Sequence, residues 1–170
     1  MKEHGETAAY PISAFHIEDG NALFYTLTGV GATLGAICLQ LLDQMIPKKN
    51  FIFSTDSYHT DSIKSQERRH RGSGERFQFK GPATIKPKDF KCFLGNEFNK
   101  QNFCELLGEV WSDTKAANRL ERTSTSIVVI NGKAWDLTVS ESEVRRTEIH
   151  ELNSNQEETD TRVILYVKYA

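Results

Sequence analysis

The chain is poor in cysteine and has no long hydrophobic run. Its 170 residues include three cysteines, Cys38, Cys92 and Cys104. They form no CxxC pair, have no zinc-type Cys/His spacing and are odd in number, which argues against a zinc site and a disulfide framework. The longest apolar stretch, residues 29–42, is too short and too rich in glycine to cross a bilayer. No signal-peptide pattern opens the sequence, so we expect an intracellular protein, in the nucleus or cytoplasm, without a membrane partner.

What the chain has is the composition of one globular domain. Hydrophobic residues make up 38% and charged residues 26% of the sequence, values close to those of ordinary globular domains. We expect a flexible N-terminus over residues 1–10 and a single α/β domain over residues 11–170. Residues 64–91 carry nine Lys/Arg against three Asp/Glu, and residues 141–160 carry seven acids against two arginines. The first segment reads as a basic connector that could meet phosphate, and the second could hold cations.

The first third of the chain has the pattern of a βαβ unit. Residues 11–19 read as a short strand, after which Gly20 and Asn21 supply a turn. Apolar residues recur at helical spacing over residues 33–45 until Pro47 stops them. The aromatic and β-branched run 50–56 then reads as a buried strand.

The remainder alternates helical and strand patterns. Residues 62–72 suit a polar helix, and residues 91–111 suit an aromatic helix that Gly95 and Asn96 divide. The pair Asn131-Gly132 joins two β-rich runs and predicts a β-hairpin over about 126–139, because a type I′ turn needs positive φ at both central residues. A third run, residues 143–152, extends this hairpin. The pattern predicts an α/β fold with a central, mainly parallel sheet.

Acidic residues follow the predicted strands and form one dense group near the end of the chain. Asp19 follows the first strand and Asp56 the second, so a right-handed βαβ unit brings both to one edge of the sheet. Glu157, Glu158 and Asp160 would face them if the hairpin places residues 153–160 at the same edge. Packed carboxylates repel one another unless a cation compensates, and Mg²⁺ or Mn²⁺ suits carboxylate oxygens. Such ions drive phosphodiester hydrolysis in nucleases.

A basic stretch begins shortly after Asp56. Its residues Lys64, Arg68 and Arg71 share one helical face, and Arg69 lies beside them. This stretch is a candidate contact with the backbone of DNA or RNA. It also reads as an ordinary solvated helix face, and a nuclear localisation signal is a further alternative.

The order of these motifs resembles the PIN-like and flap endonuclease superfamily. In that family a first strand ends in Asp, as in "IEDGNALFY", and a later strand ends in a second Asp, as in "IFSTDSY". A helix bearing Lys and Arg follows, as in "SIKSQERRHRG", and an acidic element opens a further helix, as in "EETDTRVILYVKYA". The chain is also similar, almost end to end, to uncharacterised animal proteins from transposon-rich genomes that carry "DSIK..ER.RRG" and "EEADTR" segments. This second similarity names no activity.

The resemblance implies a three-layer PIN-like domain and a metal-dependent nuclease site. It makes Asp19 and Asp56 metal ligands and Glu158 with Asp160 the acidic pair of the catalytic site. Lys64 and Arg68 or Arg69 take the place of the residues that steer the scissile phosphate. The departures are Ser57 where the family usually has glycine, and Glu-Thr-Asp in place of Glu-Ala-Glu. The sequence stops before the strand that the family's further aspartates follow, so the resemblance implies a truncated site, with an inactive fragment as the alternative.

Simpler interpretations stand beside each of these assignments. Asp19 suits a helix cap, Asp56 suits an Asx turn, and the terminal acids suit a helix N-terminus. On a regular helix Asp160 shares a face with Glu157 and not with Glu158, so periodicity and resemblance favour different partners. The run 163–167 would also suit a strand. The alternative function is a non-catalytic nucleic-acid-binding or protein-interaction scaffold, the latter through the aromatic helix.

Overall fold

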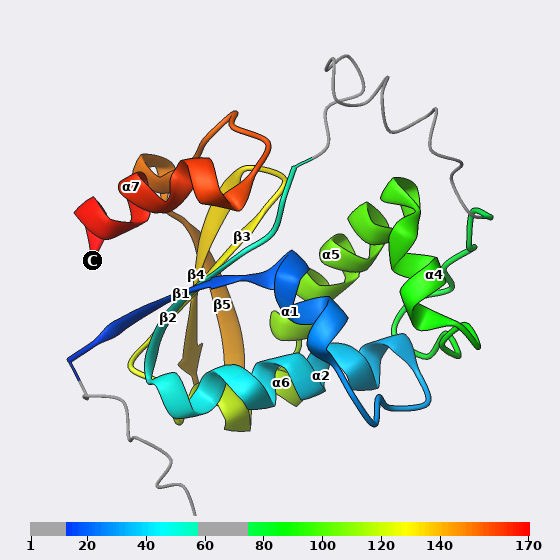
Figure 1. Ribbon diagram of the computed structural model, residues 1–170. Helices are drawn as coiled ribbons and strands as arrows, with labels where there is room; N and C mark the ends of the chain where they lie inside the picture. The colour runs from blue at the N-terminus through cyan, green and yellow to red at the C-terminus, as the bar shows by residue number, and fades with distance from the viewer. Residues whose placement is uncertain (1–12, 58–74) are drawn as a thin grey trace, which may run out of the picture.

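A central sheet organises the protein (Figure 1). The computed structural model describes residues 13–57 and 75–170. Its five strands are β1 (Phe15–Asp19), β2 (Asn50–Ser54), β3 (Thr125–Ile130), β4 (Lys133–Ser140) and β5 (Glu143–Glu148). They lie in the sheet in chain order. The pairs β1–β2 and β2–β3 are parallel, and β4 runs antiparallel to both β3 and β5. Every strand in this sheet except β4 therefore runs in the same direction, which confirms the mainly parallel α/β fold.

Helices cover both faces of the sheet and give three layers. The helices between β1 and β3 lie on one face, and α7 lies on the other (Figure 1). The connection from β1 to β2 and the connection from β2 to β3 cross the same face of the sheet. This is expected because right-handed crossovers that step along a sheet in one direction all lie on one face. The helices are α1 (Gly20–Thr26), α2 (Leu34–Met45), α4 (Phe90–Gly95), α5 (Glu97–Trp111), α6 (Thr114–Leu120) and α7 (Thr159–Tyr169), with short 3₁₀ turns η1 (Ile46–Lys48) and η2 (His150–Leu152).

The larger core fills the space between the sheet and the helices α1, α2, α4, α5 and α6. Its centre is aromatic: the ring of Phe53 lies 4.9 Å from that of Trp111, and Phe24 meets Phe103 edge to face at 5.2 Å. The indole of Trp111 donates a hydrogen bond to the carbonyl of Cys38 at 2.8 Å. Since Phe103 and Trp111 are fully buried, the aromatic residues of α5 pack in the core. Apart from Phe98, which is 44% exposed, they offer no surface to a partner.

A smaller core lies under α7 on the second face. Its buried members are Ile52, Ile127, Val129, Ala134, Leu152 and Tyr166. The half-buried residues Phe15, Ile17 and Leu165 pack against it. Because α7 packs against β1 and η2, the last helix is fixed over the first strand of the sheet. The two ends of the described chain thus lie side by side.

The hairpin prediction at Asn131-Gly132 is confirmed. Asn131 has φ 51° and Gly132 φ 75°, so both central residues adopt the positive φ that this turn requires. A Cβ atom on Gly132 would lie 2.2 Å from the carbonyl oxygen of Ser154. Ser154 also donates its amide to the Gly132 carbonyl at 2.8 Å. Glycine therefore allows the hairpin to contact the segment that leads to α7.

Several boundaries differ from the predictions. The turn predicted at Gly20 and Asn21 is wrong, because Asp19 caps a helix that begins at Gly20. The aromatic helix divides as predicted, with Asn96 capping α5. Residues 163–167 are helical and do not form the alternative strand. Helix α6 was not predicted from the sequence. The predicted flexible N-terminus (1–10) and the predicted polar helix (62–72) lie outside the described residues.

No helix in the described part of the chain has both the length and the apolar character needed to span a membrane.

Candidate functional site

Asp19 and Asp56 lie at one edge of the sheet, where β1 and β2 end side by side. Asp19 pairs in register with Ser54, and Asp56 follows two residues later. A single asparagine joins them. The backbone N–H of Asn21 donates to Asp19 Oδ1 at 2.9 Å, and its side-chain Nδ2 donates to Asp56 Oδ2 at 2.9 Å. Two acids that are far apart in the sequence therefore share one hydrogen-bonding partner.

The start of α7 comes to the same edge. The Thr159 amide donates to Asp56 Oδ1 at 3.0 Å, so Asp56 caps α7 from a remote strand, whereas the local cap residue Glu158 makes no side-chain cap bond. Asp160 lies in the first turn of α7. Burial raises the pKa of Asp19, and the negative charges of Asp56 and Asp160 raise that pKa further. Asp19 thus lies close enough to Asp56 and to Asp160 for their charges to oppose its ionisation.

A buried arginine holds this arrangement together. Arg162 is 1% exposed and its guanidinium donates to the backbone carbonyls of Thr55 at 2.7 Å and Glu157 at 3.1 Å. It makes longer bonds to the Glu158 carbonyl at 3.3 Å and the Tyr166 hydroxyl at 3.4 Å. Arg162 therefore ties the segment after β2 to the segment before α7, which fixes the backbone on either side of the carboxylates.

Hydroxyl groups complete the same junction. Ser54 Oγ and the Tyr166 hydroxyl lie 2.8 Å apart, and Thr159 Oγ1 donates to the Ser54 carbonyl at 3.3 Å. The backbone N–H of Ser57 donates to the Glu157 carbonyl at 2.7 Å. Through these bonds the "EETDTR" segment, which supplies carboxylates, also fixes the start of α7 to the end of β2.

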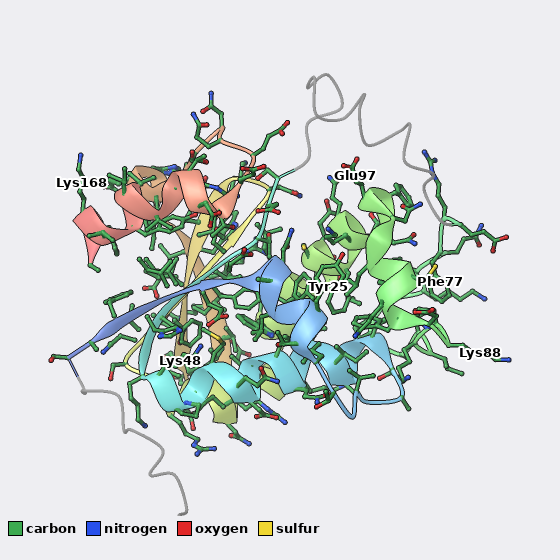
Figure 2. All side chains as sticks on the ribbon, in the orientation of Figure 1. Tyr25, Lys48, Phe77, Lys88, Glu97 and Lys168 are labelled. Atoms are coloured by element: carbon green, nitrogen blue, oxygen red, sulfur yellow. The ribbon has the colours of Figure 1, made fainter. Side chains whose placement is uncertain are left out.

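A cation and an exposed aromatic ring lie on the helical side of the acidic edge. Tyr25 of α1 is 42% exposed (Figure 2), and the Lys100 ammonium of α5 lies 5.7 Å from the centre of its ring. Burial raises the pKa of Cys104 to about 12, while Lys100 lowers it and Asp56 raises it.

The acidic site is a surface edge. A separate hollow of about 600 Å³ opens between α5 and residues 76–81 and is lined in part by Arg76, Phe98 and Glu105. Arg76 stacks over Phe98 with its guanidinium carbon 4.8 Å from the ring centre. None of the three aspartates lines this hollow.

The structure brings some of the predicted site residues together and leaves others apart. Asp19, Asp56 and Asp160 meet at one edge. Glu157 and Glu158 precede α7, which begins at Thr159, so the predicted helical face shared by Glu157 and Asp160 does not exist. The basic residues Lys64, Arg68, Arg69 and Arg71 lie outside the described residues.

Sequence reasoning missed Asn21, Thr159 and Arg162, which position these carboxylates. Asn21 follows Asp19 by two residues and is buried in α1. Its assignment to a turn implied an exposed side chain, so its contact with Asp56 was not expected. Thr159, Arg162 and Tyr166 follow one another at spacings of three and four residues, the spacing of one helical face. That face is the buried one, and recognising the helix would have revealed its polar residues.

The carboxylates are the right ligand type for a hard divalent cation, but the described ones are not grouped around one point. Carboxylate oxygens are the ligands that Mg²⁺ and Mn²⁺ favour. Over residues 13–57 and 75–170, however, no group of three His, Cys, Asp or Glu residues is placed to hold a metal ion together. Asp19 and Asp56 also serve as helix caps. Joint ligation would need the carboxylates to move closer together.

Comparisons with known proteins add no identification. No protein-family model, curated protein or solved structure gives a significant match to this chain. The resemblance to PIN-like nucleases stays a prediction from the sequence.

Proposed function

We propose that this domain hydrolyses phosphodiester bonds of nucleic acid with a divalent cation, Mg²⁺ or Mn²⁺. The observation that supports the proposal is the meeting of Asp19, Asp56 and Asp160 at the carboxyl edge of β1 and β2. The charges of the other two raise the pKa of Asp19 in addition to burial. Bringing like charges together costs stability, and a cation offsets that cost.

In this proposal some residues bind the cation and others position the residues that bind it. Asp19, Asp56 and Asp160 hold the cation, with Glu157 and Glu158 as further ligand candidates. Bound Mg²⁺ or Mn²⁺ would act as a Lewis acid toward a phosphate oxygen.

Three residues position this cation-binding set. Asn21 fixes the side chains of Asp19 and Asp56 relative to each other through its two bonds. Arg162 and Thr159 fix α7, and hence Asp160.

Contacts with the nucleic acid backbone would come from basic residues. Lys64, Arg68, Arg69 and Arg71 are the candidates from the sequence, and Lys100 is a described cation beside the ring of Tyr25 on α1. The affinity that such phosphate contacts provide decreases as salt is added, because binding releases counterions from the nucleic acid. The exposed ring of Tyr25 offers a stacking surface for a base.

Cleavage of labelled single-stranded DNA and RNA by the full chain in Mn²⁺ tests the proposal. We expect products from at least one of the two substrates, loss of products in EDTA, and loss in Asp19→Asn. Asp89→Asn is the matched control, because Asp89 caps α4 in the same way and should leave cleavage unchanged. Metal-independent products, or equal products from Asp19→Asn, would refute the assignment.

A second candidate function is a non-catalytic scaffold that keeps this fold. The observation in its favour is that Asp19 caps α1 and Asp56 caps α7, so both acids have structural work without a metal. This candidate predicts no cleavage at all. If it binds nucleic acid, binding would fall with salt and would be the same in Mn²⁺ and in EDTA.

A further inference from the structure

The hollow beside α5 lies apart from the acidic edge and has two unlike walls. One wall is a single face of α5, made by Phe98, Asn102, Glu105 and Glu109. The other, which we call the loop wall, is residues 76–81, with the aromatic rings of Phe77 and Phe79. The volume of about 600 Å³ is in the range of small-molecule sites, roughly 300 to 1,000 Å³. The hollow is therefore large enough for a ligand of that size.

The loop wall is held in place at both of its ends. At one end the buried Asn99 accepts a hydrogen bond from the Phe77 backbone N–H at 2.7 Å, and its Nδ2 donates to the Glu75 carbonyl at 3.0 Å. At the other end the Lys80 backbone N–H donates to Thr84 Oγ1 at 2.8 Å. The hollow is thus formed by the packing of the chain itself, and a preformed site loses less conformational freedom when a ligand binds.

A guanidinium stacked on a ring joins the two walls. The guanidinium carbon of Arg76 lies 4.8 Å from the centre of the Phe98 ring, and both side chains are exposed. Unpaired nucleobases stack on aromatic rings and on the planes of arginine side chains. The pair of Arg76 and Phe98 therefore offers a platform for a planar heterocycle.

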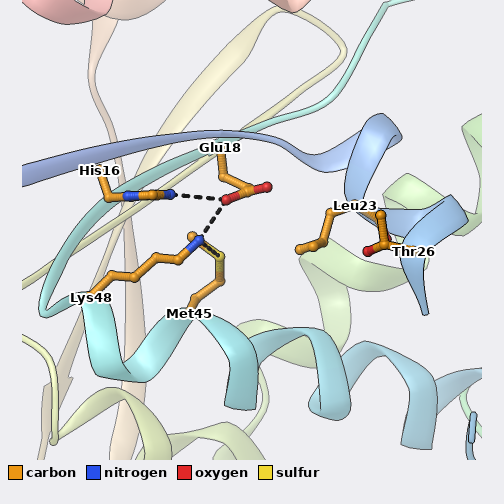
Figure 3. A network of polar contacts seen from close by, with 6 residues as sticks. All are labelled: His16, Glu18, Leu23, Thr26, Met45 and Lys48. Carbon is orange, nitrogen blue, oxygen red and sulfur yellow. Dashed lines mark hydrogen bonds and ion pairs between the residues drawn. The ribbon is translucent and has the colours of Figure 1, made fainter. Parts of the chain in front are cut away.

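The polar groups of the hollow retain hydrogen-bonding capacity. The polar side chains beside β1, in contrast, bind one another: Glu18 accepts a hydrogen bond from the Lys48 ammonium, and His16 Nε2 lies 3.0 Å from the same oxygen (Figure 3). In the hollow, Glu105 Oε1 accepts a hydrogen bond from Asn131 Nδ2 at 2.9 Å, which orients the carboxylate. Among the described residues Glu105 has no second hydrogen-bond partner, so its Oε2 is available to a ligand.

We propose that the hollow binds a guanine base, of a free nucleotide or of a single-stranded nucleic acid. The base stacks on the pair of Arg76 and Phe98. Guanine alone among the common bases has two adjacent N–H donors on its pairing edge, N1–H and N2–H, and these match the two oxygens of the Glu105 carboxylate. Asn102 lies between Phe98 and Glu105 on the same face of α5 and supplies an amide N–H for the guanine O6. Adenine presents an acceptor at N1, which a carboxylate repels.

Isothermal titration calorimetry of the full chain tests the proposal, with guanosine monophosphate and adenosine monophosphate as probes. The buffer contains EDTA, so the result does not depend on cation binding or hydrolysis at the acidic edge. We expect the guanine nucleotide to bind at least about tenfold more tightly, because a bidentate pair with a base discriminates by about that factor.

Variants of the hollow separate the two parts of the site. Glu105→Gln should remove the preference for guanine, because an amide has one acceptor oxygen where the carboxylate has two. Phe98→Ala should weaken the binding of both nucleotides, because the platform is lost. Glu143→Gln, at an exposed position on β5, is the matched control and should bind both nucleotides like the wild type. Circular dichroism establishes that each variant is folded.

Fluorescence anisotropy distinguishes the two sources of the base. It compares oligothymidylates that carry one central guanine or one central adenine, in the same buffer. Tighter binding of the guanine oligonucleotide than of guanosine monophosphate identifies a strand as the ligand, and binding that is no tighter identifies the free nucleotide. The proposal is overturned if neither guanine probe binds at millimolar concentration, if guanine and adenine probes bind equally, or if Glu105→Gln keeps the preference for guanine.

Discussion

Replacement of Arg162 by methionine removes a buried guanidinium from the junction of β2 and α7. Methionine keeps most of the side-chain length and apolar volume, so the cavity is small. The change leaves the carbonyls of Thr55 and Glu157 without the donors that now lie at 2.7 and 3.1 Å. Among the described residues the buried Thr55 carbonyl then has no donor in its place, which costs free energy because no water replaces the bond, whereas the Glu157 carbonyl keeps the bond from the Ser57 amide.

The size of the loss follows from those two shorter bonds. Hydrogen bonds to a charged group contribute about 1.5 to 3 kcal/mol each, so two contribute about 3 to 6 kcal/mol. Release of the buried charge from its desolvation penalty returns part of this. We therefore expect a net loss of about 3 to 4 kcal/mol from a total stability of about 5 to 15 kcal/mol for a domain.

Urea denaturation followed by tryptophan fluorescence measures this loss, because Trp111 is fully buried. The midpoint should fall while the slope with urea stays unchanged. Arg145→Met, at an exposed position, is the control and should change stability by less than about 0.5 kcal/mol. Arg162→Lys should have an unfolding free energy between those of Arg162→Met and the wild type. The lysine ammonium is a compact charge and cannot reach several carbonyls at once, as the planar guanidinium does. A loss below about 1 kcal/mol in Arg162→Met would refute the role of the guanidinium.

Three further perturbations follow from the structure. The raised pKa of Asp19 means that its ionisation destabilises the folded state, so Asp19→Asn should gain stability over wild type as pH rises from about 4 to 7 in metal-free buffer; Asp89→Asn is the control, and the opposite trend would contradict the reasoning. Gly132→Ala should lower the unfolding free energy by at least about 2 kcal/mol in urea melts, because of its positive φ and the close Ser154 carbonyl. Thiol titration of the native protein should find Cys92 alone reactive, because it is the exposed cysteine and burial raises the thiol pKa of the other two; fast reaction of a second thiol would contradict the packing.

Periodicity and turn chemistry were enough to predict most of the sheet. The hairpin followed from Asn131-Gly132, because few residues other than Asn and Gly adopt positive φ at both central positions. The βαβ unit followed from a helical pattern between two apolar runs. The parallel pairing of β1 and β2 then put Asp19 and Asp56 at one edge, as the rule for βαβ units predicts.

The details of the candidate site depend on contacts that sequence patterns do not contain. Asp56 caps a helix 103 residues further along the chain, and no local pattern indicates so remote a cap. Asn21 looked like a turn residue, because the same chemistry favours turns and helix starts. Arg162 was not singled out from the sequence, because its acceptors are backbone carbonyls supplied by tertiary packing.

The most direct test of the central claim, that these three carboxylates hold a divalent cation, is the melting temperature of the chain in Mn²⁺ against EDTA. At a free Mn²⁺ concentration of about 100 times the dissociation constant, binding stabilises the folded state by about 2.7 kcal/mol. For a domain of this size each kcal/mol raises the melting temperature by about 2 to 4 °C, which predicts an increase of about 5 to 10 °C. Asp19→Asn should abolish the increase and Asp89→Asn should preserve it. An unchanged melting temperature in wild type, or an equal increase in Asp19→Asn, would contradict the account.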